Sequence, residues 1–594
     1  MRMRYALSVL ALGAAMCAGA ETLTLGYAGG QYATSAPVGA GIGGEVEWLE
    51  MAIYLPPSTV ETLKGNKIIG VNGGLQSASG IETVRCWIRP ELESGENFAE
   101  FTLVPNQLNN IKTGANKLKF KQPWEIPSDY NGGLYVGFGH KLRDLNGRGI
   151  SANTTPVENA FFLFRNDGEW YDMHEYGSAC IDLVVEGDNL PASNVHVGRL
   201  DNPEYCFLAD NSYASKLVIN NFGTQEITSL DIECVFPNGE KFTETKSVKL
   251  PSNSLATIDV TLNPGEVGRG KGEVVYNITG VNGAKDADMT DNSLTGKVEV
   301  FSKSYPRYVL SEEFSTEMCG SCPPVVRMIS GMLQKPEYKN VIQVVHHAGY
   351  RTDFLTEPWH EEYTKLYLGG TFAPGLSVDR SERSKNNIVF FSDDEKVVGE
   401  LWSAHLATPA VIDVNVTANV DAADPDKLHV HVTGEKSCES PCESPVITVW
   451  VCESGIPQKN QTSGGKDYIH DHVSRAVGSA DYWGDPVKFD GDKYSYDCAI
   501  TLKPEWKRDN MSVVAFISNK GEKFSDRMVM NAGHLSFAEV GNAGVAAVAD
   551  DAEVVAVELY DLSGRRVAAD AKGMLIEQKV LSDGRKVAVK KVVR

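Results

Sequence analysis

Clusters of basic residues are missing from this sequence of 594 residues. Lys and Arg together number 56, against 78 Asp and Glu, and the formal net charge is −22. Proteins that bind nucleic acids neutralise phosphates with clustered Lys and Arg. The charge balance therefore argues against nucleic acid as a partner.

Long apolar runs and the common hydrolase motifs are missing as well. Past the N-terminus, no stretch approaches the roughly 18 apolar residues of a membrane-spanning helix, which argues against a helical transporter. Neither Gly-x-Ser-x-Gly nor His-Glu-x-x-His occurs, so the sequence lacks the usual marks of a serine hydrolase or a zinc protease. The 56 Gly, 26 Pro and 42% hydrophobic residues indicate turn-rich globular modules instead.

The first twenty residues have the pattern of a secretory signal peptide. Arg2 and Arg4 precede an apolar stretch at 6–15, and Ala18-Gly-Ala20 offers a cleavage site of small residues. Cys17 as a lipid-attachment cysteine is the alternative, although Met16 is larger than the small residue such signals prefer. Both interpretations predict export from the cytoplasm.

Cysteines are few but evenly distributed. Each expected module past the signal holds an even number of them: Cys86 and Cys180; Cys206 and Cys234; Cys319 and Cys322; Cys438, Cys442, Cys452 and Cys498. In an exported chain this distribution predicts disulfides within modules, with the pairing of the last four left open. Zinc held by Cys438, Cys442 and Cys452 is the competing explanation.

The spacing of strand-like runs predicts a multidomain, mainly β protein. Runs of β-branched and aromatic residues between turn signals indicate β-sandwiches at 21–190, 191–304 and 408–540. The second resembles bacterial immunoglobulin-like adhesion modules. Between residues 305 and 407, strands alternate with helices, which predicts an α/β domain. The expected elements are strands at 307–314, 341–347, 375–380 and 387–391, and helices at about 322–334, 357–368 and 393–406.

The motif Cys319-Gly-Ser-Cys322-Pro323 lies at the junction of the first strand and the first helix of this α/β domain. A thiolate near a helix N-terminus has a lowered pKa, because unpaired N–H groups and the helix dipole favour the anion. We expect Cys319 to attack disulfides and Cys322, one turn further on, to resolve the mixed disulfide.

The stretch from Glu312 to Pro323 resembles the active site of the thioredoxin-like outer membrane proteins of Bacteroidetes-type bacteria. Together with Tyr468–Arg475, the resemblance covers about 305–540 and implies a thioredoxin-like fold without a cofactor. Met318 stands where that family has an aromatic residue. The resemblance makes Pro374 the cis-proline facing the motif and Ala373 the residue whose backbone pairs with substrate. An ordinary turn proline is the alternative.

Several other polar residues have a structural and a functional interpretation. Glu312 or Glu313 is a candidate proton carrier, as the buried acid is in thioredoxins, against two solvated carboxylates as the alternative. We interpret His346 and His347 as structural residues. Strand alternation predicts His470 and His472 on one face, where a surface role is favoured over a metal site because no third ligand is spaced for it.

The last forty residues are similar to the type A sorting domain of the type IX secretion system. Val557-Glu-Leu-Tyr-Asp-Leu-Ser-Gly564 and the residues up to Val567 predict strand, turn, strand, and the small-residue linker at 541–553 sets residues 554–594 apart. The resemblance implies secretion or attachment to the outer membrane and cell surface, with the type IX machinery as a partner. An edge hairpin of the preceding domain is the alternative.

Two functions follow from these observations. The first is a thiol–disulfide oxidoreductase on the cell surface, acting on protein thiols or disulfides through Cys319 and Cys322. The second is an adhesion or ligand-binding protein, with a surface glycan or protein as ligand, whose α/β domain is a redox-inert scaffold.

Overall fold

The computed structural model describes residues 20–32, 36–38, 48–93, 95–142, 149–164, 168–383, 387–542, 554–560, 566–568, 573–581 and 586–593. The expected signal peptide up to residue 19, with Cys17, and most of the expected linker lie outside these residues. The chain forms two compact units, Met1–Ser304 and Tyr305–Arg594. Strands dominate both units, and the helices in the described part are all too short or too polar to cross a bilayer.

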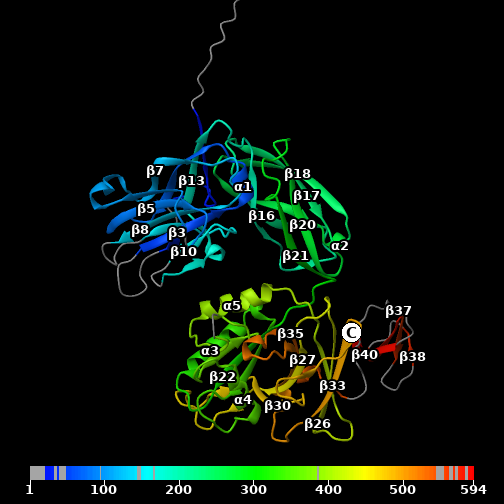
Figure 1. Cartoon of the computed structure of the whole chain (residues 1–594). Coiled ribbons are helices and arrows are strands. Elements are labelled where there is room, and N and C mark those ends of the chain that lie inside the picture. The colour runs from blue at the N-terminus through cyan, green and yellow to red at the C-terminus, as the bar shows by residue number, and fades with distance from the viewer. Residues whose placement is uncertain are drawn as a thin grey trace, which may run out of the picture. The chain divides into compact units, whose positions relative to one another are not determined.

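Two facing sheets form the N-terminal module of the first unit (Figure 1). One has the order β1 (Glu21–Leu25), β13 (Ile181–Gly187), β4 (Lys67–Leu75), β9 (Ile150–Asn153) and β12 (Ser178–Ala179), with β2 (Ala36–Val38) on β9 and β7 (Gly114–Glu125) on β4. The other has the order β11 (Trp170–Asp172), β10 (Phe162–Phe164), β3 (Trp48–Leu55), β8 (Leu134–Leu142), β5 (Ile81–Arg89) and β6 (Ala99–Leu103), and helix α1 (Pro57–Glu61) follows β3. Their apolar side chains share one buried core.

The second module of this unit is a smaller sandwich. Its three-stranded sheet has the order β14 (Val195–Asp201), β16 (Tyr213–Asn221) and β19 (Leu255–Leu262). Its five-stranded sheet has the order β15 (Cys206–Phe207), β21 (Ser293–Phe301), β20 (Gly270–Val281), β17 (Ile227–Val235) and β18 (Lys241–Leu250), with α2 (Pro264–Val267) before β20. Alternation along β17 puts Leu230, Ile232 and Cys234 into the core, as period-2 patterning requires.

In the second unit a single sheet runs across the expected boundary at 407/408. Its order is β24 (Gly375–Val378), β22 (Val309–Ser315), β23 (Val341–His347), β30 (Val473–Val477), β27 (Pro445–Glu453), β34 (Met511–Asn519) and β35 (Val529–Ser536), with β31 (Asp485–Pro486) on β27. Strand β30 joins the edge of β23 at the Val345–Val473 pair. The α/β part and the following β part therefore share one sheet.

The two faces of this sheet have different covers. Val309 faces a core completed by α3 (Cys322–Leu333) and α5 (Glu395–Ala407). The next residue, Leu310, points to the other face of the sheet, where it packs in a core together with α4 (Pro358–Tyr363). The same core also contains Trp450 and Phe516. Further along, the sheet packs on a second sheet of β32 (Phe489–Asp490), β33 (Lys493–Thr501), β26 (Lys427–Glu435), β25 (Asn415–Val420) and β36 (Gly541–Asn542).

The elements of the α/β part differ in detail from the sequence expectations. Strand β24 ends at Val378 because Asp379 and Arg380 adopt left-handed backbone angles, φ +48° and +53°. The strand expected at 387–391 is one bridge between Leu376 and Phe390. Helix α4 passes into a 3₁₀ turn at Thr364–Leu366.

The C-terminal tail forms a small separate sheet. Its order is β38 (Arg566–Val567), β37 (Val554–Tyr560), β39 (Gly573–Leu581) and β40 (Lys586–Val593). Gly564, Asp583 and Gly584, on which part of the sorting-domain resemblance depends, lie outside the described residues.

Candidate functional site

Cys319 and Cys322 form a disulfide where strand β22 passes into helix α3. The strand ends at Ser315 and the helix begins at Cys322, with prolines in its first turn, where no intrahelical N–H is needed. Cys319 is 4% exposed and Cys322 is fully buried. The arrangement puts a reducible bond at a helix N-terminus, although Cys319 is more covered than the sequence suggested.

The Ala373–Pro374 peptide bond is cis and lies beside this junction. Strand β24 pairs antiparallel with β22, and Gly375 is opposite Phe314. Pro374, immediately before Gly375, therefore lies next to the end of β22, from which the motif loop departs. Pro374 is buried and Ala373 is half-buried.

Glu312 is locked in a buried ion pair. Its two carboxylate oxygens accept hydrogen bonds from Arg380 at 2.8 and 2.9 Å, and His346 Nε2 lies 3.1 Å from Oε1. Burial alone would raise the pKa of Glu312, but Arg380 and His346 lower it to about 2. The Arg380 guanidinium also faces four aromatic rings at 5.0–5.7 Å, those of Tyr363, Trp450, Trp483 and Phe516. Glu312 is thus a permanent anion with a structural role.

Glu313, the next residue, is in the opposite situation. Its side chain is buried and its Oε1 has no hydrogen-bond partner in the described part of the chain. Burial disfavours the carboxylate and raises the pKa of Glu313 to about 8. Of the two neighbouring acids, only Glu313 can exchange a proton near neutral pH.

The raised pKa of Glu313 predicts a specific dependence of stability on pH. The folded chain keeps this proton up to about pH 8, whereas the unfolded chain releases it near the ordinary glutamate pKa of 4.5. The free energy of unfolding should therefore fall by up to roughly 1.4 kcal/mol per pH unit between these values. Glu313→Gln should remove this contribution, and the exposed Glu361→Gln should not. Urea unfolding between pH 5 and 8 measures it, and equal slopes in Glu313→Gln and the wild type would contradict it.

A second polar cluster lies beside the motif loop. His347 Nδ1 is 2.7 Å from Asp353 Oδ2, which also accepts a hydrogen bond from the Glu317 backbone N–H at 2.8 Å. His470 Nε2 lies 3.5 Å from Glu317 Oε1, and its ring centroid is 4.9 Å from that of His347. Burial, then the charge of His347, lowers the pKa of His470 to about 4. These residues hold the motif loop in place, and sequence spacing gave no sign that Glu317, Asp353 and His470 would meet.

The expected common face of His470 and His472 is wrong. Strand β29 (Ile469–His470) ends at His470, and β30 begins at Val473. His472 lies between them with φ +57°, so the period-2 alternation is interrupted. Arg475 instead pairs with Glu453 at 3.3 Å. Among the described residues, no group of three His, Cys, Asp or Glu has the geometry to hold a metal ion.

Within the described residues, the disulfides expected inside the β modules are not present. The described residues contain one disulfide, and Cys86, Cys206, Cys234, Cys442, Cys452 and Cys498 are thiols. Cys206 on β15 and Cys234 on β17 are separated by two strands, about 14 Å at ordinary strand spacing and too far for a disulfide. Cys452 and Cys498 pack into different cores. Even numbers of cysteines per module were therefore misleading.

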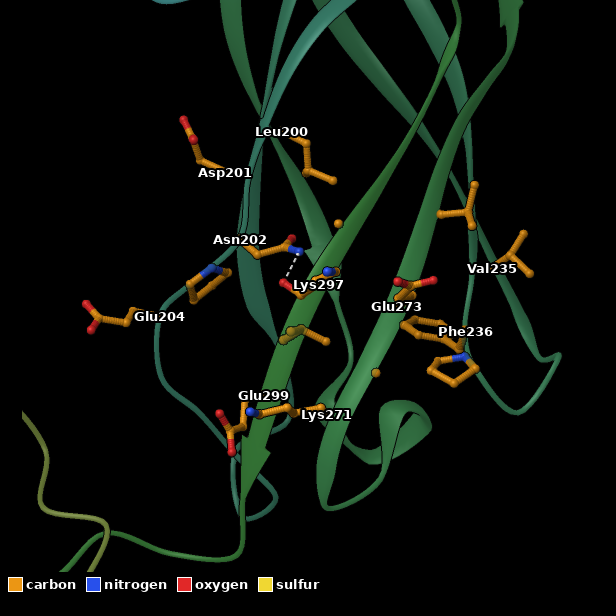
Figure 2. Close-up of a pocket in the computed structure, with 16 residues that line it drawn as sticks. Leu200, Asp201, Asn202, Glu204, Val235, Phe236, Lys271, Glu273, Lys297 and Glu299 are labelled. Atoms are coloured by element: carbon orange, nitrogen blue, oxygen red, sulfur yellow. Dashed lines mark hydrogen bonds between the residues drawn. The ribbon is translucent and has the colours of Figure 1, made fainter. Parts of the chain in front are cut away.

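A shallow groove of about 1190 Å³ lies on the five-stranded sheet of the second module. Figure 2 shows Asn202 beside it, donating to the Lys297 carbonyl at 3.0 Å, and charged side chains of both signs around it. They include Glu273, Lys271 and Glu299. This groove is an open surface feature in a unit that does not contain the disulfide.

Comparisons with known proteins relate part of the chain to outer membrane proteins. The family model "Outer membrane protein Omp28" matches residues 364–534, and no curated protein matches the chain. HBP35 of Porphyromonas gingivalis is similar in structure with 20% identity and a TM-score of 0.36, covering 49% of this chain and 100% of that chain. A domain of the outer membrane lipoprotein Omp28 from the same organism has 19% identity and a TM-score of 0.15, covering 21% of this chain and 88% of that one. The family match supports a location at the outer membrane or cell surface.

Proposed function

We propose that this chain is an outer membrane or cell-surface protein whose thioredoxin-like part exchanges disulfides with protein thiols. The observation that carries the proposal is the Cys319–Cys322 bond at the N-terminus of α3, beside the cis Ala373–Pro374 peptide. A sheet of β22, β23 and β24 with helices on both faces supports it. The Ala373 backbone would pair with the substrate chain.

The chemistry needs only the two sulfurs and protons. In the reduced protein, the Cys319 thiolate attacks a partner disulfide, forms a mixed disulfide and releases one partner thiolate. The Cys322 thiolate then attacks Cys319 Sγ and releases the second partner thiolate. The partner gains two electrons and the pair returns to the disulfide; the reverse sequence oxidises a partner dithiol. Glu313, with a pKa of about 8, is the proposed proton carrier in this region.

The C-terminal sheet of β37 to β40 supports a proposal about export. Its four strands form a sheet of their own, as expected for a sorting domain read by the type IX secretion machinery. Export by that route would present the thioredoxin-like part outside the outer membrane, where disulfides persist.

The midpoint reduction potential of the Cys319–Cys322 pair tests the proposed activity. Protein equilibrated in graded redox buffers is alkylated, and the two peptides are quantified by mass spectrometry. We expect a midpoint between about −120 and −270 mV, the range of catalytic dithiols. A midpoint below about −300 mV would mark a structural bond and overturn the proposal.

One observation favours the second candidate function, a redox-inert scaffold in an adhesion or ligand-binding protein. Cys319 is only 4% exposed, so a partner cannot reach its sulfur without a rearrangement. In that case the groove in Figure 2 is the place to look for a glycan or protein ligand. The same measurement of potential separates the two functions.

A further inference from the structure

A segment from a distant part of the sequence binds the loop that carries the disulfide. Strands β28 (Ile456–Pro457) and β29 pair antiparallel, and the chain between them at 458–468, hereafter the cap, extends over the motif. Most of its residues are exposed, but Gln461 is only 6% exposed. The Gln461 side chain is thus the buried anchor of an otherwise exposed loop.

Gln461 binds the backbone of the motif directly. Its Nε2 donates to the Cys319 carbonyl at 3.0 Å, and the neighbouring Thr462 N–H donates to the Glu317 carbonyl at 2.8 Å. The cap therefore donates hydrogen bonds to the backbone carbonyl groups on either side of Met318. An approaching polypeptide would otherwise be free to use these acceptors.

The Glu317 carboxylate fixes the other end of the cap. Its Oε1 accepts hydrogen bonds from the backbone N–H groups of Lys459 and Asn460 at 2.5 and 3.1 Å. Hydrogen bonds to a charged acceptor are stronger than neutral ones. The cap is consequently an ordered part of the site, held from both sides of Gln461.

The cap also approaches the residue between the two cysteines. A Cβ atom at Gly320 would lie 3.2 Å from Ser463 Oγ and 3.4 Å from Thr462 Cγ2. Glycine at this position lets the cap close onto the motif. The cap thus lies against the motif between its two cysteines, and Cys319 in the same motif is 4% exposed.

We propose that the cap gates the disulfide, with Gln461 as the residue that determines which partners react. A sulfur nucleophile must reach Cys319 Sγ roughly in line with the S–S bond, and it can do so only when the cap has moved away. Partners with an extended segment that replaces the bonds to Glu317 and Cys319 open the cap as they bind. Small thiols cannot replace these bonds and react only through spontaneous opening. This inference rests on the proposed function.

The rate of reduction by dithiothreitol tests the gate. Oxidised full-length wild type and Gln461→Ala are mixed with excess dithiothreitol, quenched by alkylation, and the Cys319 and Cys322 peptides are quantified over time. We expect Gln461→Ala to react about tenfold faster, as for the loss of ordinary hydrogen bonds that hold the cap closed. Lys466→Ala, which removes an exposed side chain of the same cap, should react at the wild-type rate.

The midpoint potential provides the readout that separates gating from a change in the bond itself. Gln461→Ala should leave the potential unchanged, because the cap controls access to the sulfurs. Gln461→Glu, which directs a carboxylate at the Cys319 carbonyl, should accelerate reduction as well. Wild-type rates in both Gln461 variants, or equal acceleration by Lys466→Ala, would overturn the gate. If the rates change as expected but every potential lies below about −300 mV, the gate stands and the proposed oxidoreductase fails.

Discussion

Replacing Glu312 with glutamine is expected to lower the free energy of unfolding of the second unit by about 3–5 kcal/mol. The substitution keeps the size of the side chain but leaves the Arg380 guanidinium, which is fully buried, without its counter-charge. A buried charge without a partner is among the costliest changes a core can undergo. Urea unfolding followed by tryptophan fluorescence measures the effect, because Trp450 and Trp483 lie around Arg380.

Two further variants show whether the effect comes from the lost charge. The double variant Glu312→Gln/Arg380→Met should recover most of the stability, because an apolar side chain can pack among the aromatic rings that surround Arg380. Glu400→Gln, in the exposed pair with Lys396, should change the stability by less than about 0.5 kcal/mol. A loss below about 1 kcal/mol in Glu312→Gln would show that the pair does not hold this unit together.

The Cys322→Ser variant is expected to lose disulfide exchange by about a thousandfold or more and to accumulate a mixed disulfide at Cys319. Without Cys322 no thiolate resolves the bond between Cys319 and the partner. Incubation of the reduced variant with a disulfide-containing protein, followed by non-reducing electrophoresis and mass spectrometry, measures the trapped species. A merely structural bond would not produce this species.

Cys498→Ser is the matched control for this experiment. Cys498 is a half-buried thiol on β33, packed against the core of the second sheet. Its substitution should leave the exchange rate unchanged. Trapping at any cysteine other than Cys319, or turnover by Cys322→Ser at the wild-type rate, would assign the chemistry to a different residue.

At the end of β24, tertiary contacts override the strand conformation that the sequence pattern predicts. A strand was expected through residue 380, yet Asp379 and Arg380 turn away in left-handed conformations. Asp379 then accepts hydrogen bonds from the Leu310 N–H and from His405 Nδ1, both at 2.8 Å, and Arg380 reaches Glu312. Non-glycine residues adopt such angles at an energetic cost, which these buried contacts offset. The sequence pattern around Asp379 and Arg380 does not predict this turn.

The sequence alone predicted the features that local chemistry controls. Period-2 runs predicted the mainly β modules, and helical spacing of Val326, Ile329, Met332 and Leu333 predicted α3, in which Val325, Ile329 and Met332 are the buried ones. The motif spacing also led to Cys319 and Cys322, and the resemblance to thioredoxin-like proteins led to Pro374 and to the neighbouring Glu312 and Glu313. The sequence could not distinguish the two acids, because the pKa of Glu312 depends on Arg380, which is distant in sequence, and the pKa of Glu313 depends on burial in the folded core.

Only the tertiary structure decided what surrounds the motif. The addition of β30 to the edge of β23 merges two expected domains into one sheet, and the cap, which lies just before β30 in the chain, binds the backbone of the motif. Gln461 is 142 residues from Cys319, and Arg380 is 68 residues from Glu312. Contacts at such separations depend on how sheets and cores assemble, and a periodic pattern in one segment contains no information about them. The sequence therefore shows which reactive residues are present, and only the fold determines which of them lie close together.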